Sequence, residues 1–267
     1  MFLDSARCSR SLGRRVRAAL LAFACGIVSA QAQWSVVSTQ SDFSSGRNVE
    51  HRHVVARSGS GDEATLDLAV FASTKATLRV IDQPGANEDL AAVMQRENAI
   101  AGVNGGYFDP EYAPVGLLIS DGRMVAPQRK ARLLSGIVSV VNGRVQIHRA
   151  AEFSGKSKAT AARQCGPFLV EGGKAVPGLN DARAARRTFV AVAAGDRAAI
   201  GYCSYVSLAQ LGSLLAAPAV LGDLKVTRAL NLDGGSSSGF WFKGENGPVS
   251  IREQKSVRDF LAIVPKS

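Results

Sequence analysis

The sequence reads Leu230-Asn231-Leu232-Asp233-Gly234-Gly235-Ser236-Ser237-Ser238 where an apolar segment runs into two glycines (the Asp233 motif). A second stretch repeats this pattern, Val103-Asn104-Gly105-Gly106-Tyr107-Phe108-Asp109 (the Asn104 motif). Each motif places an amide and a carboxylate beside backbone that can adopt positive φ. Such turns can direct several N–H groups into one cavity that holds phosphate oxygens; ordinary turn chemistry is the alternative interpretation. Neither motif matches the dinucleotide-binding or P-loop glycine patterns, so local chemistry alone indicates an anion site and no more.

Short strands and glycine-rich turns surround the two motifs. Alternation of apolar residues predicts strands at 65–71 and 77–81, and apolar runs predict buried strands at 100–103, 229–232 and 260–264. Asn142-Gly143 predicts a hairpin between 136–141 and 144–148, and Gly195-Asp196-Arg197 predicts another between 188–193 and 198–202. Polar, serine-rich residues 33–46 suggest a loose lead-in.

Two helices are expected. Asn87 is a suitable N-cap for a helix that ends near Asn98, with Leu90, Val93 and Met94 on one apolar face. Ser207 is expected to cap the second helix. We find neither an internal repeat nor a linker long enough to separate two domains. The pattern therefore predicts an α+β fold in a single domain, with a mixed or antiparallel sheet and few helices.

The first 32 residues have the features of a signal peptide. Five arginines precede the uncharged apolar stretch 18–28, and Ala30-Gln31-Ala32 fits the small-x-small rule for cleavage before Gln33. The apolar stretch is shorter than the roughly 20 residues that span a bilayer. A retained anchor is the alternative. We expect a periplasmic or secreted protein without an integral membrane segment after processing.

Removing this leader changes the charge. Lys and Arg fall from 32 to 27 and Asp and Glu from 22 to 21, so the formal net charge falls from +10 to +6. The remaining positive charge suits an anionic substrate or surface. We find no basic stripe interleaved with aromatic residues, the pattern that single-stranded nucleic acid requires, and therefore expect no nucleic-acid partner.

Two cysteines, Cys165 and Cys203, remain after the leader. In an oxidising compartment an even pair favours one disulfide, and two buried free thiols are the alternative. The three histidines are too dispersed to indicate a zinc site. We expect no metal and no cofactor, with calcium at the paired carboxylates as the one alternative.

The two motifs resemble the signature motifs of the phosphodiester glycosidase family. Further segments are similar to that family in the expected order, namely Pro114-Val115-Gly116, Ile119-Ser120-Asp121-Gly122, Gly166-Pro167-Phe168-Leu169-Val170 and Arg187-Thr188. The resemblance covers roughly residues 64–264. It divides the chain into a signal peptide (1–32), a lead-in with a first strand (33–63) and a phosphodiester glycosidase-like domain (64–267). One departure is that two glycines follow Asp233, where the family commonly has three.

The resemblance also implies roles for individual residues. Asp109 and Asp233 are the expected catalytic carboxylates, and Arg187 is the expected bidentate phosphate contact. The other residues expected to bind substrate are Asn104, Gly105, Gly106, Tyr107, Asn231, Gly234, Gly235, Ser236 and Ser237.

Two classes of function follow from this sequence. The first is an exported hydrolase that cleaves the glycosyl bond of a sugar-1-phosphodiester, in envelope or exopolysaccharide metabolism. The second is a non-catalytic protein of the same fold that binds glycans or assists exopolysaccharide assembly. In both, the partner is a sugar-1-phosphodiester or an anionic glycan.

Overall fold

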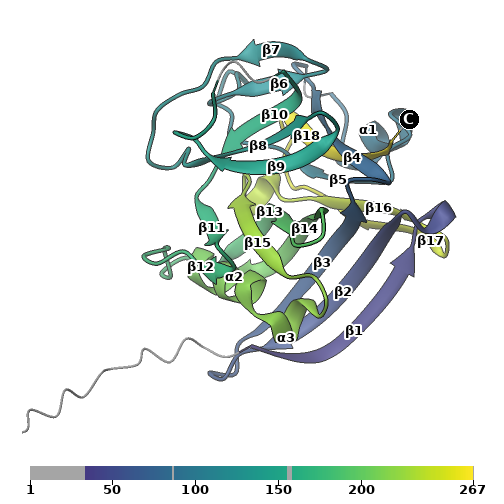
Figure 1. Ribbon diagram of the computed structural model, residues 1–267, viewed down its shortest axis with the longest axis vertical. Helices are drawn as coiled ribbons and strands as arrows, with labels where there is room; N and C mark the ends of the chain where they lie inside the picture. Colours follow the sequence, from purple (N-terminus) through teal and green to yellow (C-terminus); the bar gives the residue numbers. More distant parts are fainter. Residues whose placement is uncertain (1–33, 86, 155–157, 267) are drawn as a thin grey trace, which may run out of the picture. The chain divides into compact units, whose positions relative to one another are not determined.

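The computed structural model describes residues 34–85, 87–154 and 158–266 (Figure 1). The predicted signal peptide and the cleavage site before Gln33 lie outside these residues. Within them, no helix has both the length and the apolar character needed to cross a membrane.

Three sheets make up most of the described chain, and every strand pairing in them is antiparallel. The eight-stranded sheet has the order β1 (Ser35–Phe43), β2 (Val49–Arg57), β3 (Glu63–Ala72), β14 (Arg197–Val206), β13 (Ala185–Ala193), β15 (Val226–Asn231), β11 (Phe168–Glu171) and β12 (Lys174–Ala175). The β10 sheet has the order β7 (Arg123–Ala126), β6 (Leu118–Ser120), β10 (Ala159–Cys165), β8 (Gly136–Val141) and β9 (Arg144–Arg149). The β18 sheet has the order β17 (Gly247–Ile251), β16 (Phe240–Gly244), β5 (Ala101–Asn104), β18 (Asp259–Pro265) and β4 (Ala76–Asp82).

The described residues contain three α-helices, which are α1 (Leu90–Arg96), α2 (Leu208–Ala216) and α3 (Pro218–Leu221). Two 3-10 turns, Ser45–Arg47 and Gly235–Ser237, complete the regular structure of these residues. The prediction of a sheet-rich fold with few helices is confirmed.

Local signals explain several of these elements. Asn142 and Gly143 both have positive φ, 50° and 70°, in the tight turn between β8 and β9, as the Asn-Gly pair predicts. Ser207 caps α2 in a capping box with Gln210, because the side-chain oxygen of each residue accepts the backbone N–H of the other.

Two local predictions are wrong. The cap of α1 is Asp89, whose carboxylate accepts the Ala92 N–H, and not Asn87. Asn and Asp both cap helices, so the sequence alone is compatible with a helix that begins after either residue. The segment expected to be a loose lead-in forms β1 instead, which pairs with β2 over most of its length. Backbone pairing holds this polar strand at the edge of the sheet, and its side chains are mostly exposed.

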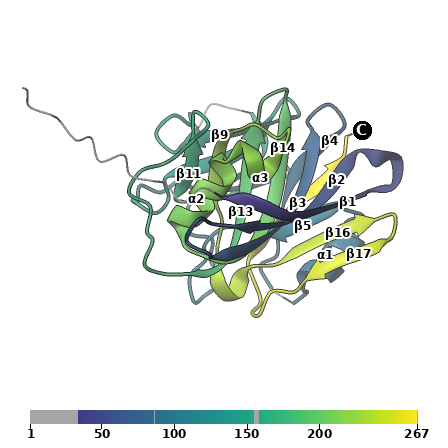
Figure 2. The same cartoon turned by 90° about the horizontal axis from the view of Figure 1, so that it is seen from below.

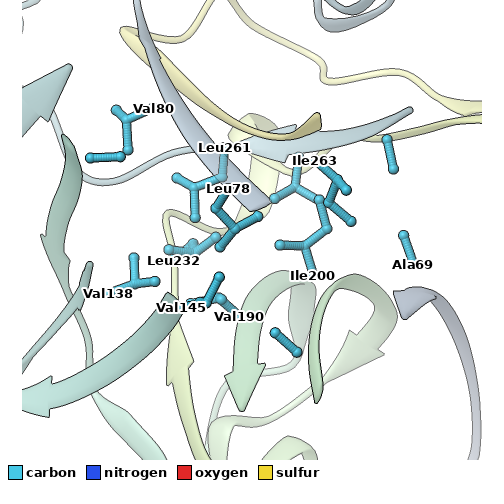
Figure 3. Close-up of a cluster of buried hydrophobic side chains, with 14 of the residues drawn as sticks. Ala69, Leu78, Val80, Val138, Val145, Val190, Ile200, Leu232, Leu261 and Ile263 are labelled. Atoms are coloured by element: carbon cyan, nitrogen blue, oxygen red, sulfur yellow. The ribbon is translucent and has the colours of Figure 1, made fainter. Parts of the chain in front are cut away.

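A shared apolar core joins the three sheets (Figure 3). Val190 and Ile200 come from the eight-stranded sheet, Val138 from the β10 sheet, and Leu78 and Leu261 from the β18 sheet. Helices α2 and α3 lie against the eight-stranded sheet (Figure 1). A separate apolar cluster packs them there, with Leu211 and Leu214 from α2 and Val220 and Leu221 from α3. The strands therefore lie in fixed positions, and the loops that carry the two motifs extend from them.

One ion pair is completely buried where the β10 and β18 sheets meet. Arg163 on β10 donates from Nε to both carboxylate oxygens of Asp259 on β18, at 3.0 and 3.1 Å, and both side chains are 0% exposed. The other guanidinium nitrogens donate to the backbone oxygens of Tyr107, Val115 and Gln164. A buried charge is tolerated when it is paired and its remaining hydrogen-bonding groups are satisfied.

We predict that Arg163→Met lowers the free energy of unfolding by about 3–5 kcal/mol, because it leaves the Asp259 carboxylate buried without a cation. Urea denaturation measures this loss. The control Arg57→Met removes the exposed pair Arg57–Glu63 and should change stability by less than about 1 kcal/mol. Equal losses in the two variants would contradict the importance of the buried pair.

Candidate active site

The two motifs meet, although they lie at the ends of strands in different sheets. The Asp233 N–H donates to the Gly105 carbonyl at 3.0 Å. The Asp233 carbonyl accepts from the Asn104 amide at 2.7 Å and from the Thr188 hydroxyl at 2.8 Å. The end of β5, the end of β15 and strand β13 are thus hydrogen-bonded together around one residue.

The carboxylate of Asp233 is held inside its own motif. Oδ2 accepts from the Ser237 hydroxyl at 2.6 Å, and Oδ1 accepts from the Gly234 N–H at 3.0 Å. The 3-10 turn Gly235–Ser237 places Ser237 for this contact, and Gly235 begins it with φ of 64°. Burial raises the pKa of Asp233, while the Ser237 hydrogen bond and the charge of Lys255 oppose the rise. The site therefore holds a carboxylate that changes protonation at a higher pH than an exposed aspartate does.

The two asparagines hold backbone groups in place. Asn104 is buried, and its amide uses both ends, with Nδ2 on the Asp233 carbonyl and Oδ1 on the Gly239 N–H. Asn231 donates from Nδ2 to the carbonyls of Gly166 and Leu232. Its Oδ1 is buried and accepts no hydrogen bond from the described residues. Asn104 was expected to bind substrate, but its amide is used to hold the backbone of the motif that carries the Asp233 carboxylate.

Tyr107 links the Asn104 motif to the β10 sheet. Its hydroxyl donates to the Gly166 carbonyl at 2.6 Å and lies 3.5 Å from the Asn231 amide nitrogen. Burial raises the pKa of Tyr107, and the neighbouring Cys165 and Asp233 add to the rise, whereas Asn231 and Arg187 oppose it. The phenol therefore stays protonated at neutral pH and acts as a hydrogen-bond donor.

Arg187 is a half-buried cation on β13, beside the Asp233 motif. Its Nε donates to the Val206 carbonyl and its Nη2 to the Arg183 carbonyl, at 3.1 and 2.8 Å. Its Nη1 would lie only 3.5 Å from a Cβ placed on Gly234, so the guanidinium lies directly beside the Asp233 motif. Burial lowers the pKa of Arg187, an effect that the nearby Tyr107 opposes. Among the described residues, no carboxylate forms an ion pair with it.

A family model for phosphodiester glycosidases matches residues 97–264, which is more than half of the chain and includes both motifs. The chain belongs to the phosphodiester glycosidase family. The resemblance inferred from the motifs is thereby confirmed. A comparison with curated proteins gives no significant match.

Three solved structures share this family fold at low sequence identity. The catalytic domain of zebrafish N-acetylglucosamine-1-phosphodiester alpha-N-acetylglucosaminidase, auto-inhibited by its pro-peptide, has 14% identity and a TM-score of 0.58 over 90% of this chain and 85% of that one. A protein from Synechocystis has 13% identity and a TM-score of 0.57 over 82% of this chain. This match spans 62% of the Synechocystis chain. A protein from Burkholderia pseudomallei has 15% identity and a TM-score of 0.56 over 79% and 77%.

The contacts of Asp109, the other expected catalytic carboxylate, lie within its own turn. Its Oδ1 accepts the Ala113 N–H at 2.7 Å, and its backbone pairs with Ala113 and Tyr112. Its assignment as a catalytic residue of this phosphodiester glycosidase stays a prediction. The two serines expected to bind substrate differ in exposure. Ser236 is exposed, whereas Ser237 is buried and already donates to Asp233.

The predicted disulfide is wrong. Cys165 and Cys203 are both buried free thiols, one on β10 and the other on β14 in a different sheet. Burial raises the pKa of Cys165 to about 12 and raises that of Cys203 as well, so neither thiol ionises readily. The prediction rested on the even number of cysteines. It failed because the sequence gives no information on the distance between two strands.

The described residues contain no group of three or more His, Cys, Asp and Glu side chains that could hold a metal ion. The calcium alternative thus gains no site from these side chains. Other contributors to this family site had no sequence signal. Arg163 and Asp259 act through a contact between distant segments, and Lys255 lies on a loop without a motif. Thr188 lies in the Arg187-Thr188 segment that resembles the family, but its hydrogen bond to the Asp233 carbonyl is seen only in the structure. The aromatic residues Phe240, Trp241 and Phe242 are buried in strand β16.

Proposed function

We propose that this phosphodiester glycosidase hydrolyses the glycosyl bond of a sugar-1-phosphodiester, releasing a free sugar and a phosphate monoester. One observation carries the proposal. The Arg187 guanidinium has no carboxylate partner among the described residues and lies beside Gly234, next to the half-buried Asp233 carboxylate. A half-buried cation without an acidic partner suits an anionic ligand, and the planar guanidinium matches the geometry of phosphate.

The proposed chemistry divides between these two residues. Glycosyl transfer passes through an oxocarbenium-like transition state, and a carboxylate assists attack at the anomeric carbon. In its ionised form Asp233 accepts the proton of the attacking water. The leaving group is a phosphate monoester that is already stable as an anion, so it needs little help from a general acid. Arg187 offsets the negative charge that develops on this leaving group.

The alternative is a glycan-binding protein of the same fold that does not catalyse a reaction. It requires Arg187 for binding and gives Asp233 only a structural role. The raised pKa of Asp233 favours the enzyme, because buried carboxylates with shifted pKa values are common among catalytic acids and bases.

We further propose that the chain is exported and acts in the periplasm or outside the cell, on envelope or exopolysaccharide material. The arginine-rich, apolar leader and its small-residue cleavage pattern support export. The expected outcome is protein in the extracytoplasmic fraction whose intact mass corresponds to a chain that begins at Gln33. Recovery of the unprocessed chain in the cytoplasm alone would refute export and would leave the proposed chemistry untouched.

The pH dependence of hydrolysis tests the role of Asp233. Because the base must be ionised, kcat/KM should rise with pH through the raised pKa of Asp233 and fall as the pH drops below it. Ser237→Ala removes a hydrogen bond that lowers this pKa, so the acid limb should move to higher pH. The control is Ser236→Ala, because the Ser236 side chain makes no contact with Asp233 among the described residues. This variant should leave the acid limb in place. Asp233→Asn should lower kcat by about 10²-fold or more.

A shift of the acid limb that is the same in both serine variants, or full activity in Asp233→Asn, would contradict this role. Circular dichroism on each variant excludes unfolding as the cause of a loss.

Substitution of Arg187 by Lys tests the phosphate contact. The variant keeps the positive charge and loses the planar fork, so kcat/KM should fall by about 10²-fold, as for the loss of one transition-state donor. Steady-state kinetics on a defined sugar-1-phosphodiester measures the fall. Arg183→Lys is the control, because only the backbone carbonyl of Arg183 contacts Arg187. Near-normal turnover of folded Arg187→Lys would end this assignment.

A further inference from the structure

Strand β7 and the loop after it form an exposed surface that is both basic and apolar, the 123–133 surface. Strand β7 is the outer strand of the β10 sheet, at the top of the view in Figure 1. The surface has four exposed cations, Arg123, Arg129, Lys130 and Arg132. Its apolar side chains, Met124 and Leu133, are 58% and 59% exposed, and they are two of the five large apolar side chains that are exposed among the described residues. Exposed apolar groups that gather beside charged residues are typical of interaction surfaces.

The positive charge of this surface is not compensated by the protein. Among the described residues, no carboxylate forms an ion pair with any of the four cations. Residues 122–151 contain neither Asp nor Glu. The acidic residues on either side of this stretch are already paired, Asp121 with Arg79 and Glu152 with Arg228. The surface therefore attracts an anionic partner.

A single buried side chain holds the loop in place. Gln164 on β10 is 0% exposed, and its Oε1 accepts the Arg129 N–H at 3.0 Å. Its Nε2 donates to the carbonyls of Arg129 and Leu134, at 2.7 and 3.1 Å. Both ends of the basic stretch are thus fixed to the β10 sheet through their backbone, while the charged side chains stay in solvent. Such an ordered loop loses little conformational freedom when a partner binds.

The combination of charges and apolar groups indicates the kind of partner. Lys and Arg side chains are attracted to anionic lipid headgroups, and each one adds to the attraction. Exposed side chains such as Met124 and Leu133 gain from entering the boundary between headgroups and acyl chains. A soluble polyanion would use the cations but would leave both apolar side chains in water. The surface therefore fits a bilayer better than a charged polymer.

We propose that the 123–133 surface docks this protein reversibly on a bilayer that contains anionic phospholipids, with Met124 and Leu133 inserted among the headgroups. Docking requires no catalysis and is independent of the proposed function. The loop also borders the candidate site. A Cβ on Gly166 would lie 2.2 Å from the Leu133 carbonyl oxygen, and the Gly166 carbonyl accepts the Tyr107 hydroxyl. A docked protein therefore has its candidate site close to the membrane surface.

Co-sedimentation with lipid vesicles tests the docking. The described residues form one compact unit, so the experiment uses a chain that begins at Gln33, in which the basic leader cannot contribute. This chain should bind vesicles made of equal parts of phosphatidylglycerol and phosphatidylcholine, and it should not bind vesicles of phosphatidylcholine alone. Binding should weaken as the salt concentration rises.

The triple variant Arg129→Gln, Lys130→Gln, Arg132→Gln should lower the affinity for the mixed vesicles by about 10²-fold. The matched control removes the same charge elsewhere, by Lys75→Gln, Lys225→Gln and Lys243→Gln together. All three lysines are exposed, and Lys243 is on β16, which lies beside β17 (Figure 2). The control should lower the affinity by less than about threefold, because charges away from the contact are screened.

Leu133→Ser tests the apolar part of the contact and should weaken binding to the mixed vesicles by about tenfold. Its control is Val37→Ser on β1, where the side chain is 51% exposed on a different sheet. Val37→Ser should bind like the wild-type chain.

Equal losses in the two triple variants would show attraction by net charge alone and would overturn the docking surface. Failure of the wild-type chain to bind the mixed vesicles would overturn it as well. Binding to soluble polyphosphate without binding to vesicles would replace the bilayer by a polymer. Unchanged binding of Leu133→Ser would contradict insertion of the apolar side chains. Thermal melting of each variant confirms that it is folded, and none of these results depends on hydrolysis.

Discussion

The buried pair between Arg163 and Asp259 is the interaction on which the rest of the site depends. It leaves no room above it for a side chain. A Cβ on Gly105 would lie 1.7 Å from Asp259 Oδ1, and one on Gly106 would lie 2.5 Å from Arg163 Cζ. Neither glycine has positive φ, so the backbone conformation does not require glycine here. Close packing against the charge pair requires it at both positions. The carboxylate also accepts the Gly106 N–H at 3.2 Å, and the guanidinium donates to the Tyr107 carbonyl, so the pair fixes the backbone of the Asn104 motif directly.

Hydrogen bonds fix the Asp233 motif against this backbone. The Gly105 carbonyl, one peptide unit from the ion pair, accepts the Asp233 N–H. Asn104 and Thr188 then hold the Asp233 carbonyl from two other strands. The side chain of Asp233 is left to Ser237 and Gly234, within its own turn. The main chain thus sets the position of Asp233, while burial raises the pKa of its carboxylate and the Ser237 hydroxyl and the charge of Lys255 oppose the rise. These two properties can be varied separately by substitution.

Local sequence signals predicted the elements that are stabilised locally. The Asn142-Gly143 hairpin and the Ser207 cap depend on residues within a few positions, and the structure has both. Arg163 and Asp259 lie 96 positions apart, and a lone arginine in an apolar strand carries no sign of a distant partner. The disulfide failed for the same reason, because the number of cysteines does not fix the distance between two strands. The motifs indicated two segments that meet in the structure. What distinguishes Asp233 from Asp109 is its backbone, which is hydrogen-bonded to the distant residues Asn104, Gly105 and Thr188.

The buried and half-buried arginines of the described residues differ in their partners. Arg163 and Arg258 pair with carboxylates in protected positions, where an uncompensated charge would be costly. Arg187 is half-buried as well, but its guanidinium contacts two carbonyls and no described carboxylate. These carbonyl oxygens accept hydrogen bonds from its N–H groups but do not neutralise its charge. Burial disfavours the charged form and therefore lowers the pKa of Arg187. In the proposed function, the phosphate of the substrate supplies the negative charge beside this ordered guanidinium. The preference that follows is for the anion itself, whichever sugar lies on one side of the phosphate and whichever alcohol on the other.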